Sequence, residues 1–157
     1  CRVLRRFPGL PHRGELVAEV GGVRWINDSK GTNVGATLAA IAGLGPTLAG
    51  RLILLAGGVG KGADFTPLAE PLARYGREAI LFGLDAERLA RTLRGRLPIT
   101  EVEELSQAMA RAAEIAEPGD CVLLSPACAS LDQFANYQER GEVFRRWVRR
   151  HLGQEAT

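Results

Sequence analysis

The sequence predicts an α/β fold: a Rossmann-like, mostly parallel sheet of about six strands with helices on both faces. Two observations predict it. Short apolar runs alternate with longer segments of helical periodicity from residue 23 onward, which is typical of a parallel sheet covered on both sides. Before them, the glycine pair Gly21-Gly22 separates two strand-like runs. This pattern indicates an opening hairpin and therefore one antiparallel strand.

The individual elements follow from the same pattern, with the hairpin expected at residues 15–20 and 23–27. Apolar residues at helical spacing predict helices, and apolar runs bounded by Gly, Pro or Asp predict strands. Thr32 or Asn33 can cap the helix after the hairpin, and Pro67 suits the first turn of the next one. The expected order is helix 33–43, strand 51–56, helix 66–75, strand 78–83, helix 85–94, strand 98–102, helix 103–116, strand 120–124, and helical segments within 130–152.

The last helical segment is amphipathic. Its apolar stripe consists of Val143, Phe144, Trp147, Val148 and His151. Arginines at positions 145, 146, 149 and 150 lie off this stripe, and we interpret them as a solvated face. The alternative is a non-catalytic interaction domain that uses this basic face to bind a partner.

Composition restricts the possible classes. The 157 residues suffice for a single domain, 1–157, and the net charge of +2 argues for no nucleic-acid or membrane partner. The sequence contains no run of 18 apolar residues and no signal-peptide pattern. Three cysteines and two histidines without ligand spacing predict no zinc site and indicate a reducing cytoplasm. The chain begins at Cys1 in a basic stretch, so we expect it to be a fragment of a longer protein.

Polar loops follow three of the predicted strands. The first is Asp28-Ser29-Lys30-Gly31-Thr32-Asn33, the second runs from Gly57 to Ala63, and the third runs from Ser125 to Ser130. Ligands of open parallel sheets bind beyond the carboxyl ends of the strands, so these loops should share one edge. Hydroxyl, ammonium and amide groups beside a helix N-terminus are suited to a polyanion.

Two of the loops also have interpretations without a ligand. The first loop can simply be solvated, with Thr32 or Asn33 as the N-cap of the next helix. In the third loop, Ser130 and Gln133 have the spacing of a capping box.

The glycine loop has an alternative interpretation as a nucleotide site. It is not a Walker A loop, because Gly62 stands where Ser or Thr should follow Lys61. It does fit the loose dinucleotide fingerprint through Gly58, Gly60 and Ala63, with Asp85 near the place of a ribose-binding acid. A stand-alone dinucleotide-binding Rossmann module is therefore the alternative function.

Taken in order, the motifs resemble the C-terminal domain of the Mur ligases, closest to the members that add D-glutamate. The likeness extends from about Phe7 to Val148. The motifs that carry it are Gly9-Leu10-Pro11-His12-Arg13, Trp25-Ile26-Asn27-Asp28-Ser29-Lys30, Thr32-Asn33-Val34-Gly35-Ala36-Thr37, Gly60-Lys61 with Ala63-Asp64-Phe65, and Leu124-Ser125-Pro126-Ala127-Cys128-Ala129-Ser130-Leu131-Asp132-Gln133-Phe134.

The resemblance implies an ATP-dependent acid–amino-acid ligase of peptidoglycan synthesis, with three domains. The first domain holds the UDP-sugar, the central one carries the ATP P-loop, and the third closes over both. ATP phosphorylates the carboxyl of UDP-N-acetylmuramoyl-L-alanine, and the amine of D-glutamate attacks the acyl phosphate. This chain has no P-loop, so the isolated domain is expected to be inactive. Magnesium ligands are expected mainly in the central domain, and the enzyme's own other two domains are the expected protein partners.

The resemblance also implies roles for individual residues. The nucleotide side comprises His12, Arg13, Asp28 and Lys30, and the D-glutamate side comprises Thr32, Lys61, Ser130, Leu131 and Tyr137. Arg13 would reach the ATP phosphates, and Asp28 would accept ribose hydroxyls from a cleft position that contributes little to the core. No catalytic residue or metal ligand is expected within this domain alone. Val59 stands where the family has an acid, and Tyr137 where it has Phe.

Overall fold

The computed structural model describes residues 15–29, 33–58, 64–125, 127–128 and 136–152. Its described part contains a six-stranded sheet of order β1-β2-β6-β3-β4-β5. Among these six described strands, β1 and β2 pair in antiparallel fashion and the other neighbouring strands are parallel. The predicted fold class and its opening hairpin are therefore confirmed. The strands are β1 (Glu15–Val20), β2 (Val23–Asn27), β3 (Leu52–Gly57), β4 (Gly76–Phe82), β5 (Ile99–Glu101) and β6 (Cys121–Leu124).

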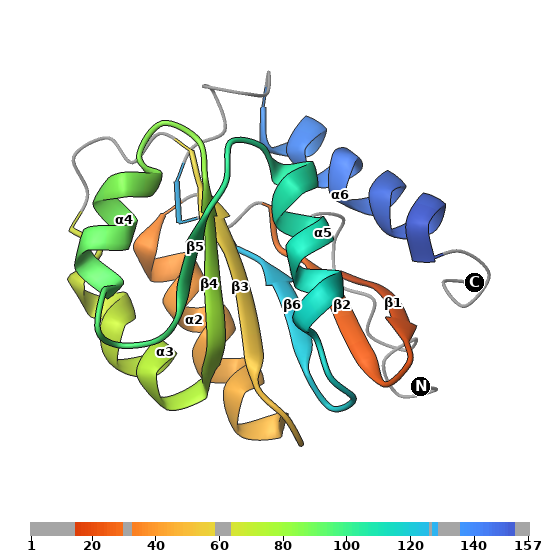
Figure 1. Cartoon of the computed structure of the whole chain (residues 1–157), viewed down its shortest axis with the longest axis horizontal. Helices are drawn as coiled ribbons and strands as arrows, with labels where there is room; N and C mark the ends of the chain where they lie inside the picture. Colours follow the sequence, from red (N-terminus) through yellow and green to blue (C-terminus); the bar gives the residue numbers. More distant parts are fainter. Residues whose placement is uncertain (1–14, 30–32, 59–63, 126, 129–135, 153–157) are drawn as a thin grey trace.

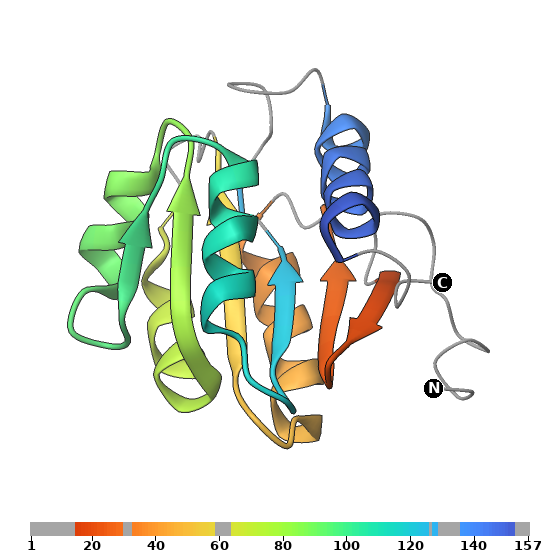
Figure 2. The same cartoon turned by 45° about the vertical axis from the view of Figure 1, so that its right-hand side comes forward.

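Helices cover both faces of this sheet, as Figures 1 and 2 show. One face packs against α2 (Val34–Leu44), α3 (Ala69–Tyr75) and α4 (Ala86–Leu93). The other packs against α5 (Leu105–Ile115) and α6 (Tyr137–Leu152). Two short 3-10 helices, η1 (Gly45–Thr47) and η2 (Thr66–Leu68), complete the described elements.

The predicted helix 66–75 is divided into η2 and α3. A continuous α-helix would need an amide at position 71 to bond the carbonyl of Pro67, and Pro71 has no N–H. With α3 beginning at Ala69, Pro71 lies in the first turn, where its missing donor is not needed.

The core lies on both sides of the sheet. Along β3, Leu52, Leu54 and Ala56 pack toward α2, α3 and α4, while Ile53 and Leu55 pack toward α5 and α6. All of them are fully buried. Burial on both faces explains why this strand is a continuous apolar run in the sequence rather than an alternating one.

The carboxyl ends of β2, β6 and β3 lie side by side at one edge of the sheet, because these strands are adjacent and parallel. Asn27 of β2 and Leu55 of β3 both pair with Leu124 of β6. The chain leaves β3 through Gly57, whose φ is 144° and where a Cβ would lie 1.8 Å from the carbonyl oxygen of Phe82. The predicted convergence of the strands that precede the three polar loops is thus confirmed.

At the opposite edge, the buried carboxylate of Asp120 joins the start of β6 to the residue before β3 and to β4. Asp120 accepts hydrogen bonds from the amides of Arg51 (2.8 Å) and Glu117 (2.9 Å) and from Arg77 Nε (2.7 Å). Burial alone would raise the pKa of Asp120, but these donors outweigh burial and the pKa lies below its ordinary value. The same pairing raises the pKa of Arg77.

The last helix, α6, is amphipathic as predicted, with two exceptions. Phe144 and Val148 are buried, and arginines 146, 149 and 150 are exposed. His151 was predicted on the apolar stripe but is exposed, because its ring instead stacks on the outer side of Trp147 at a centroid distance of 4.3 Å. Arg145, predicted to be solvated, is half-buried and forms an ion pair with Glu142 at 2.6 Å.

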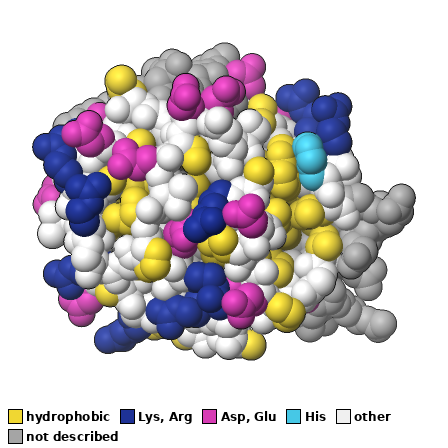
Figure 3. All heavy atoms as spheres, viewed as in Figure 1, with side chains coloured by type: hydrophobic (Ala, Val, Ile, Leu, Met, Phe, Trp, Pro, Cys, Tyr) yellow, Lys and Arg dark blue, Asp and Glu magenta, His cyan; other side chains and the backbone are white. Residues whose placement is uncertain are grey.

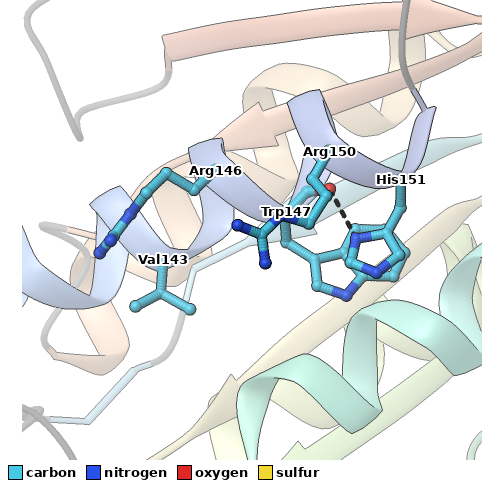
Figure 4. Close-up of a pocket in the computed structure, with 5 residues that line it drawn as sticks. All are labelled: Val143, Arg146, Trp147, Arg150 and His151. Carbon is cyan, nitrogen blue, oxygen red and sulfur yellow. Dashed lines mark hydrogen bonds between the residues drawn. The ribbon is translucent and has the colours of Figure 1, made fainter.

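Figure 3 shows apolar side chains gathered between α5 and α6, with basic side chains beside them. A shallow pocket of about 250 Å³ on the C-terminal half of α6 is lined by Val143, Arg146, Trp147, Arg150 and His151 (Figure 4). Among the described helices, none combines the length and the apolar character that a membrane crossing requires.

Candidate functional site

Asp28 and Tyr137 are the predicted site residues that the structure places at the edge formed by β2, β6 and β3. The other predicted residues lie outside the described part of the chain: His12, Arg13, Lys30, Thr32, Lys61, Ser130 and Leu131. Two residues that directly adjoin them are described, namely Ser29 before Lys30 and Asn33 after Thr32. The site is therefore described through the residues at the ends of its loops.

Asp28 is held at the junction of β2 and β6 through both its backbone and its side chain. Its amide donates to the carbonyl of Leu124 at 2.7 Å, and the Ser125 hydroxyl contacts its Oδ2 at 3.0 Å. The residue is only 8% exposed. The expectation that Asp28 contributes little to the core was therefore wrong, because its carboxylate belongs to a buried polar network.

That network continues into α2. The hydroxyls of Ser125 and Thr37 lie 3.0 Å apart, and Thr37 Oγ1 also donates to the Ser125 carbonyl at 3.1 Å. Both residues are fully buried. The N-cap of α2 is Asn33, whose Oδ1 accepts from the Ala36 amide at 2.8 Å. This contact decides between the two capping residues that the sequence allowed.

A second buried group, centred on Arg140, joins the loops after β2 and β6 to α6. Its guanidinium donates to Ser29 O through Nη2 (2.8 Å), to Ser29 Oγ through Nε (3.1 Å) and to Cys128 O through Nη1 (3.1 Å). The Ser29 hydroxyl in turn donates to the carbonyl of Tyr137 at 2.6 Å. Arg140 is fully buried, and a planar fork with five N–H donors is suited to binding several carbonyl oxygens at once.

The start of α6 brings Arg140 to this place. Asn136 precedes the helix and accepts from the Glu139 amide at 2.8 Å, which is the pattern of an N-cap. Tyr137 and Arg140 follow in the first turn, three residues apart and hence on one face. Tyr137 itself is half-buried, and its carbonyl takes part in the group.

Sequence reasoning missed Arg140 because it stands in the charged run Glu139-Arg140-Gly141-Glu142. A signal was nevertheless present. Arg140 precedes Phe144 and Val148 by four and eight residues, and this spacing places it on the buried stripe of the helix. A charged residue on the apolar stripe of a helix is rarely buried without partners. The spacing could therefore have predicted that Arg140 is buried and hydrogen-bonded.

The loop after β6 contains a strained backbone position. Ala127 has a φ of 63° and is almost fully buried. A left-handed conformation costs a residue with a Cβ about 1–2 kcal/mol, and such strain persists only where the surroundings fix it. Here Ser125 and Cys128, on either side, are held by the two buried polar groups.

The glycine loop contacts the start of α4. The Asp85 amide donates to Gly58 O at 2.9 Å, and the Asp85 carboxylate lies 3.8 Å from Arg88 Nη1. Gly60 and Ala63 of the dinucleotide fingerprint lie outside the described residues. The first α-helix after the loop begins only at Ala69, whereas a pyrophosphate-binding helix opens within the glycine motif.

Two residues of the motif Ala63-Asp64-Phe65 have structural roles. Asp64 Oδ1 accepts from the Thr66 amide at 3.0 Å, and hydrogen bonds from the Thr66 side chain and amide lower the pKa of this exposed carboxyl. Phe65 is buried, and the Arg88 guanidinium lies 5.1 Å from its ring centroid. Within the described ranges, no group of three His, Cys, Asp or Glu side chains is placed to hold a metal ion.

The fold and the motifs of this edge are those of one family. Residues 12–128 match the family model of the Mur ligase, glutamate ligase domain, so the chain belongs to the Mur ligase family. It is 73% identical over 148 residues to the UDP-N-acetylmuramoylalanine--D-glutamate ligase of Chromohalobacter salexigens, which covers 94% of this chain and 32% of that protein. The chain thus spans about a third of the length of the curated relatives it matches.

Solved structures share the fold at low sequence identity. The E. coli FolC protein in complex with ADP aligns with a TM-score of 0.65 and 20% identity, over 92% of this chain and 33% of that one. A domain from a putative UDP-N-acetylmuramate:L-alanyl-gamma-D-glutamyl-medo-diaminopimelate ligase of Haemophilus ducreyi aligns with a TM-score of 0.58 and 14% identity, over 90% of this chain and 100% of that one.

Proposed function

We propose that the chain is the C-terminal domain of an ATP-dependent ligase that adds D-glutamate to UDP-N-acetylmuramoyl-L-alanine in peptidoglycan synthesis. The observation that carries this proposal is the 73% identity to a ligase with that name, which extends over 94% of the chain. The geometry supports it independently of the name. Three loops with polar and cationic residues leave adjacent strand ends, and two buried polar groups hold the first residues of two of these loops, Asp28 and Ser29 after β2 and Ser125 after β6.

The nucleotide side of the proposed site is built around Asp28. Its carboxylate is held at the strand ends by Ser125, where it can accept the ribose hydroxyls of ATP. We assign the ATP phosphates to Arg13, whose planar and permanently charged guanidinium binds phosphate oxygens in pairs, with His12 and Lys30 beside it. The E. coli FolC protein, which shares the fold, was solved with ADP.

The D-glutamate side requires two separated anchors, because the ligand has two carboxylates. Thr32 and Lys61 follow β2 and β3, while Ser130, Leu131 and Tyr137 follow β6. An ammonium group and the amides at helix starts are suited to carboxylates. Arg140 supports this half of the site, since it binds carbonyl groups just before the loop residues that would contact the ligand.

The rest of the reaction would take place on the other domains of the full-length enzyme, in the cytoplasm. ATP supplies the phosphoryl group that activates the substrate carboxyl, and Mg²⁺ would be held mainly by the central domain. This domain would close over ATP and bring D-glutamate to the activated carboxyl. Phosphoryl transfer needs a phosphate cradle and bound magnesium. We therefore expect the purified 157-residue chain not to hydrolyse ATP, and steady phosphate release above a contaminant control would contradict this.

The substrate assignment is tested in the full-length ligase with Lys61→Ala. Losing the cation should raise the D-glutamate KM at least tenfold, because one carboxylate loses its partner, while the ATP KM changes little. Arg96→Ala, which removes an exposed cation from the turn after α4, is the matched control and should change neither constant. Ser130→Ala is a second probe, although it also removes a possible helix cap of about 1 kcal/mol, so its stability must be measured first.

D-Glutamine provides the matched ligand, since it keeps the length of D-glutamate and lacks one charge. The wild-type ligase should use it far less well. Equal use of the two amino acids, or a Lys61→Ala effect confined to ATP, would refute the assignment. Binding of NAD to the isolated chain, measured by calorimetry, would instead favour a dinucleotide-binding module.

A further inference from the structure

We propose that Ser125 and Thr37 are positioning residues that fix the Asp28 carboxylate for the nucleotide. This inference rests on the proposed function, because it takes Asp28 as the ribose acceptor. It adds two residues that were not predicted to bind a ligand: Thr37 lies within α2, and Ser125 is the first residue of the loop after β6. They act, in this proposal, only through Asp28.

A chain of hydrogen-bond contacts connects Thr37, Ser125 and Asp28, which come from three different parts of the fold. Thr37 lies in the first turn of α2, Ser125 follows β6 directly, and Asp28 follows β2. Thr37 and Ser125 contact each other through their hydroxyls at 3.0 Å, and Ser125 contacts Asp28 Oδ2 at 3.0 Å. Thr37 and Ser125 are inaccessible to solvent, so water does not compete for these contacts.

The number of hydroxyl protons decides which oxygen each hydroxyl donates to. The two hydroxyls carry two protons but form three contacts: with Asp28, with each other, and from Thr37 to the Ser125 carbonyl. An ionised carboxylate can only accept, and hydrogen bonds to charged groups are the stronger ones. The Ser125 proton therefore goes to Asp28. The Thr37 proton then serves the oxygens of Ser125, which keeps Ser125 in the rotamer that faces Asp28.

This arrangement prepares Asp28 before a nucleotide arrives. The backbone of Asp28 is fixed by its hydrogen bond to Leu124, and its side chain is fixed by Ser125. A carboxylate with both parts held loses little freedom when it accepts a hydroxyl pair, and such preorganisation favours binding. The opposing view is that the two hydroxyls only satisfy each other inside the core.

Three variants of the full-length ligase separate these views. Ser125→Ala should raise the ATP KM about tenfold and leave the D-glutamate KM within twofold, because only the nucleotide side depends on Asp28. Thr37→Val should raise the ATP KM by a smaller factor of about three to five. Thr37→Ser keeps the hydroxyl and should restore the wild-type ATP KM. The matched control is Thr92→Val on α4, where a half-buried threonine also donates to a helix carbonyl; it should leave every kinetic constant unchanged.

A double-mutant cycle tests whether Ser125 acts through Asp28. Asp28→Ala should raise the ATP KM more than tenfold, and adding Ser125→Ala to it should change the ATP KM by less than twofold. Independent, multiplying effects of the two substitutions would overturn the proposal. So would a Ser125→Ala variant that is less stable but keeps a normal ATP KM while Asp28→Ala raises it. If Ser125→Ala does not fold, Thr37→Val decides by the same criterion.

The failure of the proposed function would look different. An Asp28→Ala ligase with an unchanged ATP KM would show that Asp28 does not bind the nucleotide. That result would overturn both the nucleotide assignment and the positioning proposal. A raised ATP KM in Asp28→Ala together with normal values in Ser125→Ala and Thr37→Val would overturn the positioning proposal alone.

Discussion

Replacing Arg140 with methionine tests whether the buried guanidinium holds the loops of the sheet edge together. Methionine keeps much of the length and the apolar stem and removes the charge and the N–H donors. In the wild type, those donors reach Ser29 O, Ser29 Oγ and Cys128 O at 2.8–3.1 Å. The substitution therefore removes three contacts that join two loops to α6.

The magnitude follows from two opposing effects. Hydrogen bonds from a charged donor contribute about 1.5–3 kcal/mol each, so three independent bonds would total about 4.5–9 kcal/mol. One guanidinium makes all three, however, and its removal also removes the several-kcal/mol cost of burying a charge. The two buried carbonyl oxygens of Ser29 and Cys128 that lose their donor cost about 1–3 kcal/mol each, which gives a net loss of about 2–6 kcal/mol. We expect Arg140→Met to lower the free energy of unfolding by this amount, from a total of about 5–15 kcal/mol.

Urea denaturation of the 157-residue chain, followed by circular dichroism, measures this difference. The chain has its own apolar core on both faces of the sheet, so we expect the isolated chain to fold. Arg146→Met is the matched control, because Arg146 lies on the same helix and is exposed; it should change stability by less than about 0.5 kcal/mol. A loss below about 1 kcal/mol for Arg140→Met would refute the reasoning.

Two further predictions concern the frame of the sheet. Asp120→Asn should cost about 2–3 kcal/mol at pH 7, because the neutral side chain loses the ion pair with Arg77 and replaces one acceptor oxygen by an NH2 group that faces N–H donors. The pKa of Asp120 is lower in the folded state than its ordinary 3.8. The stability that Asp120 contributes is therefore complete above about pH 4 and is lost as the pH falls through the lower, folded-state pKa. Urea titrations at pH 7 and pH 3 should show a smaller difference in unfolding free energy between wild type and variant at pH 3, and an equal difference at both pH values would contradict this. Gly57→Ala should cost more than about 3 kcal/mol or prevent folding, because its Cβ would lie 1.8 Å from Phe82 O at a φ of 144°. Gly43→Ala, where nothing lies within 4 Å of the new Cβ, should instead stabilise α2 by up to about 1 kcal/mol, and similar melting temperatures for both variants would refute the steric argument.

The sheet was predictable because its evidence is local. The fully apolar run of β3 and the glycine turn between β1 and β2 each report burial or chain reversal within a few residues. The position of β6 between β2 and β3 was not predictable in the same way. Parallel strands that are distant in sequence choose neighbours by packing, which no local pattern records. The shared edge still followed, because all parallel strands end at the same side.

The polar interior of the site was the part that the sequence concealed. Asp28 was expected in an open cleft, and its burial depends on Ser125, which lies 97 residues away in the chain. Thr37 gave no signal, since one threonine in a helix is ordinary. Arg140 had a detectable signal in its spacing to Phe144, but its charge argued for the surface. Long-range hydrogen bonds of this kind require the fold before they can be recognised.

We expect the left-handed backbone at Ala127 to set stability against ligand affinity, because its methyl group adds strain and also restricts the loop. A laboratory selection for heat resistance would favour glycine here, because glycine adopts a φ of 63° without the penalty that alanine bears. The same exchange would let the free loop sample many more shapes between Ser125 and Cys128. Part of the binding free energy of each ligand would then be offset by the entropy lost when the more flexible loop becomes ordered. A more heat-resistant domain with weaker affinity is the expected product of such a selection.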